Sequence, residues 1–256
     1  MIRWVYAFID RPRESFERAA QFWTAVTDTH LSSRRGDAQE FATFLPESGD
    51  AYLKLQGVIE GGGGHLDFAL EEQDIAGEVR RAVDLGAEVL EQIKGFAVLK
   101  SPAGLPFCFV TWEGENVRPD VVGHPGGATS RLDQACLDIG PSQYAAEAAF
   151  WPAVTGWDRV RGSLPEFEVL RPGPGIPVRI LLQRLGQDRP ASLHHDLACS
   201  DMEQVRAVHE ALGARLEHPG NGWLVMSDPV GGSYCLTGRD PNTGSRPTAP
   251  QTPPVP

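Results

Sequence analysis

The chain has 256 residues, a hydrophobic content of 41% and a net charge of −11. Nucleic acids and anionic membrane surfaces are bound by clustered Lys and Arg, so this charge argues against both as partners. No run of apolar residues approaches the ~18 that a membrane span needs, and the N-terminus lacks the pattern of a signal peptide. We therefore expect a cytoplasmic protein with no nucleic-acid or membrane partner.

Short strands alternate with two helices in residues 1–112. The first helix is expected over 15–26, where apolar residues recur at helical spacing. The second begins at Asp74 and ends at Gly86, because Asp favours the start of a helix and Gly its end. The strands are expected at 5–9, 40–45, 51–56, 65–70, 96–99 and 106–111.

The rest of the chain repeats this order. Phe22-Trp23 returns as Phe150-Trp151, one of five short matches that recur at offsets of 127 to 129 residues. A repeat of this length is a whole domain, because solenoid units recur every ~20–50 residues. The sequence predicts domains at 1–112 and 131–238, a polar Gly-rich linker at 113–130 and a disordered Pro-rich tail at 239–256.

Pro152 is the main difference between the two units. It falls late in the first helix of the second unit, where proline lacks an N–H group and clashes with the preceding turn. We therefore expect that helix to end or kink near Trp151. Each unit otherwise follows the order strand, helix, three strands twice. The predicted fold class is α+β, with four βαβββ modules paired two by two.

Short motifs in both halves carry a resemblance to a known family. Each half has Phe-Trp in its first helix, a Leu-Gln strand end and a strand that contains His-x-Asp. The segments are Leu55-Gln56, His65-Leu66-Asp67-Phe68, Leu182-Gln183, His194-His195-Asp196-Leu197 and Asp228-Pro229-Val230-Gly231. The chain resembles the vicinal oxygen chelate superfamily, and more narrowly its glyoxalase-like domains. The resemblance implies two tandem glyoxalase-like domains.

In metal-using members of that superfamily, the ligands lie on the first, fourth, fifth and eighth strands of a domain. The matching positions are Arg3, Gln56, His65 and Pro106 in the first unit, and Arg131, Gln183, His194 and Ser233 in the second. Arginine and proline cannot bind a cation, and neither set holds a carboxylate. We therefore expect no metal and no other cofactor in either domain.

A divalent metal remains the alternative, by two routes. The two domains could pair so that His65 and His194 share one ion. An alignment shifted by two residues would instead place Asp133 or Gln134 where Arg131 is expected.

Two His-Asp pairs are candidate catalytic groups. His65 and Asp67 are two residues apart, as are His194 and Asp196, so each pair shares one face of a strand. Such a His could act as a general base while the Asp fixes its tautomer. The alternative is a structural pair that orders the edge of a sheet.

Aromatic and amide side chains on the lining strands are candidates for a ligand pocket. They are Trp4, Tyr6, Tyr52, Gln56, Phe107, Gln183, Trp223 and Tyr234. Trp23 and Trp151 fall on helix stripes that we expect to pack in the core. Cys108 and Cys235 lie at equivalent positions in apolar runs and are expected as buried core thiols.

The leading functional hypothesis is a metal-independent protein that binds an apolar or aromatic metabolite. Antibiotic sequestration, as in the bleomycin-resistance proteins of the superfamily, is one version of it. The alternative is a glyoxalase-like lyase, isomerase or dioxygenase that uses His65 or His194 as a base or metal ligand. In both cases the partner is a small molecule, and we expect a monomer whose two domains form an internal pseudo-dimer.

Overall fold

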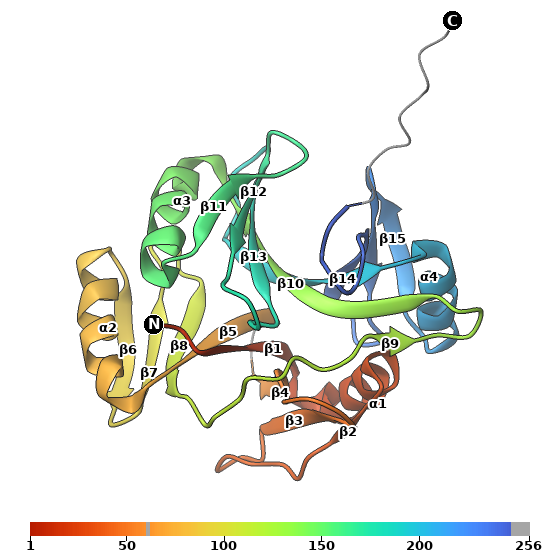
Figure 1. Cartoon of the computed structure of the whole chain (residues 1–256), viewed down its shortest axis with the longest axis horizontal. Helices are drawn as coiled ribbons and strands as arrows, with labels where there is room; N and C mark the ends of the chain where they lie inside the picture. The colour runs from red at the N-terminus through yellow and green to blue at the C-terminus, as the bar shows by residue number, and fades with distance from the viewer. Residues whose placement is uncertain (60–61, 247–256) are drawn as a thin grey trace, which may run out of the picture.

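The computed structural model describes residues 1–59 and 62–246. Strand–helix–strand modules follow one another along the chain (Figure 1). The first module has β1 (Trp4–Pro12), α1 (Phe16–Thr27), β2 (Thr29–Leu31), β3 (Phe41–Pro46) and β4 (Leu53–Val58). The second has β5 (Gly63–Leu70), α2 (Glu72–Asp84), β6 (Glu88–Ile93), β7 (Phe96–Lys100) and β8 (Pro106–Thr111). A short 3-10 turn, Arg13–Ser15, leads into α1.

The second half repeats the pattern. Its first module has β10 (Thr129–Ile139), α3 (Pro141–Thr155), β11 (Asp158–Arg161), β12 (Phe167–Arg171) and β13 (Arg179–Arg184). Its second module has β14 (Ser192–Cys199), α4 (Met202–Ala211), β15 (Arg215–Pro219), β16 (Trp223–Ser227) and β17 (Ser233–Gly238). The connection between the halves adds β9 (Val122–Gly123), which pairs with β10. The predicted α+β fold of four βαβββ modules is confirmed.

Each half forms one sheet with its two modules side by side. The strand order is β2-β3-β4-β1-β5-β8-β7-β6 in the first half and β11-β12-β13-β10-β14-β17-β16-β15 in the second. The central pairs β1–β5 and β10–β14 are antiparallel, and a parallel neighbour flanks each central strand. The first, fourth, fifth and eighth strands of each half are therefore adjacent, as the family resemblance implies.

The two halves pack by placing the first helix of each against the sheet of the other. Trp23 of α1 lies 5.2 Å, ring centre to ring centre, from Tyr234 of β17. Trp151 of α3 lies 5.3 Å from Phe107 of β8. As a result α1 lies near α4, and α3 lies near α2 (Figure 1). All four rings are buried, so this exchange joins the two halves in one hydrophobic core.

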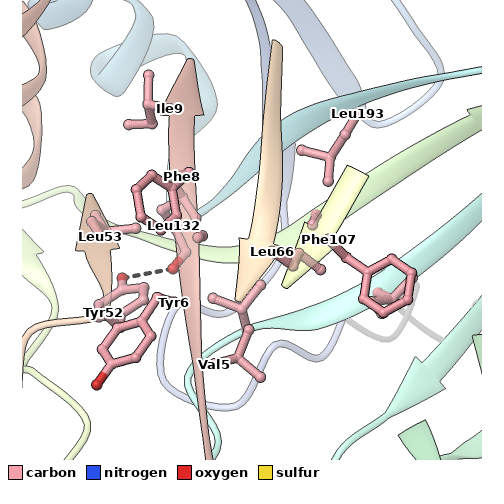
Figure 2. Packing of buried hydrophobic residues seen from close by; sticks show 14 of the residues in the cluster. Val5, Tyr6, Phe8, Ile9, Tyr52, Leu53, Leu66, Phe107, Leu132 and Leu193 are labelled. Carbon is pink, nitrogen blue, oxygen red and sulfur yellow. Dashed lines mark hydrogen bonds between the residues drawn. The ribbon is translucent and has the colours of Figure 1, made fainter. Parts of the chain in front are cut away.

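Polar contacts also cross between the halves. The Tyr52 hydroxyl donates to the carbonyl oxygen of Leu132 at 2.7 Å (Figure 2). The His195 ring donates from Nε2 to the carbonyl oxygen of Phe8 at 2.8 Å. A Cβ atom at Gly64 would lie 2.6 Å from that ring nitrogen. Only glycine therefore allows β5 to pass this close to β14.

Helix α3 does not end at Pro152, contrary to one of the two outcomes expected for it. Helix α3 continues through it to Thr155 and ends at Gly156, which adopts a left-handed conformation. Pro152 has no N–H group to donate to the carbonyl of Ala148, four residues earlier. Arg159 donates to that carbonyl from Nη1 at 2.7 Å instead. A side chain from the next strand thus replaces the missing helical bond.

The C-terminal segment differs in part from the predicted tail. Residues 240–246 form a turn in which the Asp240 N–H donates to the Ser245 carbonyl at 2.8 Å. The rest of that predicted tail, 247–256, lies outside the described residues. Among the helices of the described residues, none is long and apolar enough to cross a membrane.

Candidate functional site

The central strands of the second half direct several polar side chains to one face of the sheet. Cys136 on β10 pairs with His194 on β14, and directly paired residues have their side chains on the same face. Asp196 shares that face with His194, because residues two apart on a strand point the same way. Cys235 on β17 pairs with Asp196 and joins them. We call this face the cup of the second half.

Asp138 and Gln183 complete the cup. Asp138 follows Cys136 by two residues and pairs with Gln183 on β13. The Sγ atom of Cys136 lies 3.4 Å from Oε1 of Gln183. The His194 ring lies between two carboxylates, with Nδ1 3.2 Å from Oδ2 of Asp138 and Nε2 3.4 Å from Oδ1 of Asp196.

Two groups of ligand-type side chains overlap at His194. One is Cys136, Asp138 and His194, and the other is His194, Asp196 and Cys235. Within each group the ligand atoms lie within 4.8 Å of one another, a spacing that an ion with bonds of ~2.0–2.3 Å can bridge. Oδ1 of Asp196 is buried and has no hydrogen-bond partner among the described residues. A cation would satisfy that atom, so the residues fit a divalent metal.

Asp196 is also held from behind. Its Oδ2 atom accepts a hydrogen bond from the amide of Gln134. Oε1 of Gln134 in turn accepts one from Nε of Arg179 at 2.7 Å. This chain fixes the carboxylate with its free oxygen, Oδ1, toward His194.

Charge and burial shift the pKa values of the cup. Burial disfavours the charged form of His194, but the sulfur atoms of Cys136 and Cys235 and the Asp138 and Asp196 carboxylates beside its ring outweigh burial, so the His194 pKa is raised well above its usual value. Burial raises the Cys136 pKa to about 12 and also raises that of Cys235. A metal that binds these thiols has to displace their protons.

A small cavity opens onto these groups. Its volume is about 80 Å³, and it is lined by Cys136, Gln183, His194, Asp196 and Cys235 together with Phe167 and Trp223. The rings of Phe167 and Trp223 meet edge to face with 5.7 Å between their centres. Drug-sized ligands need cavities of ~300–1,000 Å³. The small cavity alone therefore accommodates only a small group of atoms, but Gln183, His194 and Cys235 also line a second cavity of about 610 Å³.

The equivalent face of the first half is filled by its own side chains. Phe8 pairs with His65, where the second half has Cys136 and His194, and the two rings stack with 4.2 Å between their centres. Nζ of Lys54 lies 3.6 Å from the centre of the Tyr6 ring. His65, Asp67 and Cys108 do form a group of possible ligands. The aromatic ring and the nearby ammonium make this half a poorer fit for a cation.

Comparison with known sequences places both halves in one family. The family model for the glyoxalase-like domain matches residues 7–110 and again residues 134–237. The chain belongs to the glyoxalase-like domain family. No curated protein matches it.

Solved structures with this fold include proteins of different activity. The Mn(II)-bound glyoxalase from Novosphingobium aromaticivorans is 16% identical, with a TM-score of 0.64 over 96% of this chain and 87% of its own. The 2,2',3-trihydroxybiphenyl 1,2-dioxygenase from Sphingomonas wittichii is 13% identical, with a TM-score of 0.62 over 93% of this chain and 90% of its own. A 2,3-dioxygenase from a Pseudomonas species is 12% identical, with a TM-score of 0.63 over 91% and 90%. At these identities the likeness shows the fold alone.

The expected ligand positions of the two glyoxalase-like halves were misaligned on two of the four strands. Strand pairing places Phe8 and Cys136, not Arg3 and Arg131, on the face of the two histidines. On the eighth strand the positions belong to Cys108 and Cys235 rather than Pro106 and Ser233. Arg131 lies at the far end of β10, opposite Ala198 and beyond a bulge.

The expectation that neither domain binds a metal is therefore corrected. Ligand-type side chains do come together in the cup, and one structural relative of the family is a Mn(II)-bound glyoxalase. The two routes to a metal considered from the sequence, an ion shared by His65 and His194 and an alignment shifted by two residues, do not describe this arrangement. Each group of possible ligands in the described part of the chain draws on one half, so His65 and His194 do not meet. The alignment is shifted by five residues at Arg131, not by two.

The other predicted pocket residues fall in three places. Gln183 and Trp223 line the cavity of the second half. Tyr6 and Gln56 lie on the filled face of the first half, by alternation with Phe8 and by pairing with Asp10. Trp4 lies on that face too, at its far end, where its indole donates to the Ala51 carbonyl. The rest pack elsewhere: Tyr52 bonds to Leu132, and Phe107 and Tyr234 contact the helices of the opposite half.

Cys136, Asp138 and the role of Cys235 were not predicted. A signal was present for Asp138, because it recurs at the repeat offset as Asp10. Oδ2 of Asp10 lies 2.8 Å from Nδ1 of His65, as Asp138 lies beside His194. Both histidines are thus held by an aspartate from the first strand of their half. The sequence-based pairing with Asp67 or Asp196 describes only the other ring nitrogen.

Proposed function

We propose that the second glyoxalase-like domain binds a divalent metal ion and forms the active site of an enzyme that acts on a small molecule with adjacent oxygen atoms. The observation that carries the proposal is the largely buried His194 imidazole, 14% exposed, between two carboxylates and beside two thiols. These groups come from three of the four central strands and border a cavity. The first domain then serves as a scaffold, because Phe8 and Lys54 fill its equivalent face.

The residues that would hold the ion are His194, Cys136, Cys235 and Asp196. Asp138 would hold Nδ1 of His194, which orients the ring and leaves Nε2 for the metal. Two thiols and one imidazole favour Zn²⁺ or another ion that accepts sulfur ligands over Mg²⁺ or Ca²⁺. When bound, such an ion polarises substrate oxygens and stabilises the negative charge that develops on them.

The chain's own residues favour a lyase or isomerase over a dioxygenase. Iron oxygenases typically use two His and one carboxylate, whereas this cup offers one imidazole and two thiols. Phe167 and Trp223 would exclude water and contact the apolar part of the substrate. Active-site thiols require a reducing compartment, which supports a cytoplasmic location.

Metal content tests this proposal, and the repeat supplies matched controls. The purified protein, loaded with Zn²⁺ and dialysed, is expected to retain one equivalent by elemental analysis. Cys136→Ser and Cys235→Ser are expected to lose most of it, because each removes a thiolate ligand. Cys108→Ser and His65→Ala, which change the first half, are expected to retain it. Circular dichroism checks that each variant is folded.

Two results would contradict the proposal. One is a wild-type protein that retains no metal after loading. The other is a metal lost on changing His65 or Cys108 but kept on changing Cys136 and Cys235. Loading with Co²⁺ adds a second readout, because thiolate ligands give a charge-transfer band in the near ultraviolet that oxygen and nitrogen ligands lack.

A further inference from the structure

Arginines gather at one mouth of the cup. A cavity of about 570 Å³ adjoins the small cavity and shares Arg179, Arg239, Arg246 and neighbouring residues with it. Its arginines are Arg118, Arg161, Arg171, Arg179, Arg239 and Arg246. We call these six residues the arginine mouth. They come from the connection between the halves, from three strands of the second half and from the segment after β17.

Most of this positive charge is not neutralised. Asp133 is the one carboxylate that lines this cavity in the described residues, and both of its oxygens accept from Arg239 at 2.6 Å. Arg179 uses Nε to hold Gln134. The side chains of the other four, Arg118, Arg161, Arg171 and Arg246, make no ion pair or hydrogen bond within residues 1–59 and 62–246. Nε and Nη2 of Arg118 are buried without a partner, which is costly for a guanidinium.

The overall charge of the protein makes this cluster unusual. The chain carries 34 acidic and 23 basic Lys and Arg residues, so an average surface would be negative. Burial, and then the like charge of neighbouring Arg239, lower the Arg179 pKa to about 10, because both disfavour its charged form. A bound anion would remove both the repulsion and the desolvation cost.

The other half lacks these arginines. Strand pairing aligns Phe167 with Phe41 and Gln183 with Gln56. By the same alignment, the positions of Arg171, Arg179 and Arg239 are held by residues that cannot bind an anion by charge. They are Leu45, Tyr52 and Trp112. Three of the six positions of the arginine mouth are thus uncharged in the half whose group of possible ligands has one thiol.

We propose that the arginine mouth binds a carboxylate or phosphate group of the substrate while its adjacent oxygens reach the cup. This rests on the proposed function in assigning the anion to the substrate of that cup. Guanidinium groups bind both kinds of anion through paired N–H donors. The substrate class is then an organic acid or a phosphate ester, with its apolar part beside Phe167 and Trp223.

The test is calorimetric titration of the full chain with malonate and with pyrophosphate, as purified and again after metal removal. Malonamide, which has the shape of malonate without its charge, is the control ligand. We expect at least one anion to bind, binding to weaken as salt is added, and malonamide not to bind. The tighter anion identifies the group as carboxylate or phosphate.

Arginine variants locate the binding. Arg171→Gln combined with Arg246→Gln is expected to weaken the tighter anion roughly tenfold or more, because two charged donors are lost. Arg215→Gln removes an exposed arginine on β15 and is expected to change nothing. The inference would be overturned if neither anion bound, or if the double variant and Arg215→Gln weakened anion binding equally.

Failure of this inference is distinguishable from failure of the proposed function. If the protein holds Zn²⁺ through Cys136 and Cys235 but binds neither anion, the proposed metal site stands and the inference about the arginine mouth fails. If it binds an anion through Arg171 and Arg246 but holds no metal, the arginine mouth stands and the proposed metal site fails. The metal-free titration separates the two cases.

Discussion

At the scale of single residues, the site depends on how His194 is held. A carboxylate from β10 lies at Nδ1 and one from β14 lies at Nε2. Oδ1 of Asp196 is buried and accepts no hydrogen bond within the described chain, whereas Oδ2 of Asp138 lies beside both Nδ1 of His194 and Nη2 of Arg189. We therefore assign Asp138 to orienting the ring and Asp196 to the metal position. The first half keeps the same arrangement of His65 with Asp10, but Phe8 stacks on the ring.

Asp138→Asn tests this division of roles. The amide keeps the size of the side chain but weakens its hold on Nδ1, and loss of such a partner typically costs 10- to 100-fold in metal affinity. We expect a Zn²⁺ affinity lower by about that factor, measured by competition with a chromophoric chelator. Asp10→Asn makes the same change in the first half and is expected to leave the affinity unchanged. Equal affinity in all three proteins would contradict the assignment.

His209 gives a pH dependence that is separate from the site. It is fully buried against Tyr234, and burial followed by the charge of His124 lowers its pKa to about 3. The unfolded chain binds this proton near pH 6.5 and the folded chain only near pH 3. Stability from this group is therefore full above pH 6.5 and is lost as the pH falls toward 3.

Urea denaturation between pH 4 and 7 measures this effect. One proton taken up on unfolding changes the free energy of unfolding by at most about 1.4 kcal/mol per pH unit. In His209→Gln, which keeps a polar group near the Tyr234 hydroxyl, the slope is expected to be smaller by up to that amount. The same slope in wild type and variant would show that His209 does not titrate in this way.

At the scale of elements, the sequence predicted which residues share a face of a strand but not how a long strand is aligned with its neighbour. Alternation placed His194 and Asp196 on one face, and apolar spacing placed Trp151 in the core. However, β10 spans Thr129–Ile139 and carries a bulge near Leu132. Nothing local tells which of its alternate residues lie opposite His194, so Arg131 was aligned in place of Cys136. Cys108 and Cys235 were expected to be core residues because they lie in apolar runs, and a buried cysteine does not by itself indicate function.

The junction of β5 and β14 yields a prediction at this scale. In Gly64→Ala the new Cβ would press on the Phe8 carbonyl and lie 2.6 Å from Nε2 of His195. Neither the strand backbone nor the buried ring can move freely, so we expect a loss of about 2–4 kcal/mol in the free energy of unfolding. Gly173→Ala has no atom within 4 Å of its new Cβ and is the control. If Gly64→Ala lowered the free energy of unfolding no more than Gly173→Ala does, the prediction would be contradicted, and the two strands could separate at no cost in free energy.

At the scale of the whole molecule, the two halves share one architecture and have different sites. The first helix of each half packs against the sheet of the other half. Glu147 of α3 accepts hydrogen bonds from the Trp151 indole and from the Ala103 N–H of the first half. The halves thus cover each other's sheets. The second half keeps the thiols and adjoins the arginine mouth, while the first fills its equivalent face with Phe8 and Lys54.

This mutual covering predicts a monomer. The apolar surfaces that single domains of this kind would expose, such as Phe107 and Tyr234, are already buried within the chain. Light scattering coupled to size exclusion is expected to give the chain mass of 27.8 kDa. Twice that mass at micromolar concentration would contradict the prediction.

X-ray absorption at the zinc edge of the Zn²⁺-loaded protein tests the metal centre most directly. We expect a shell of sulfur atoms at ~2.3 Å, from Cys136 and Cys235, and a shell of nitrogen and oxygen atoms at ~2.0–2.2 Å. Any zinc that the Cys136→Ser, Cys235→Ser double variant still retains should show no sulfur shell. A spectrum with nitrogen and oxygen alone in the wild-type protein would contradict this expectation.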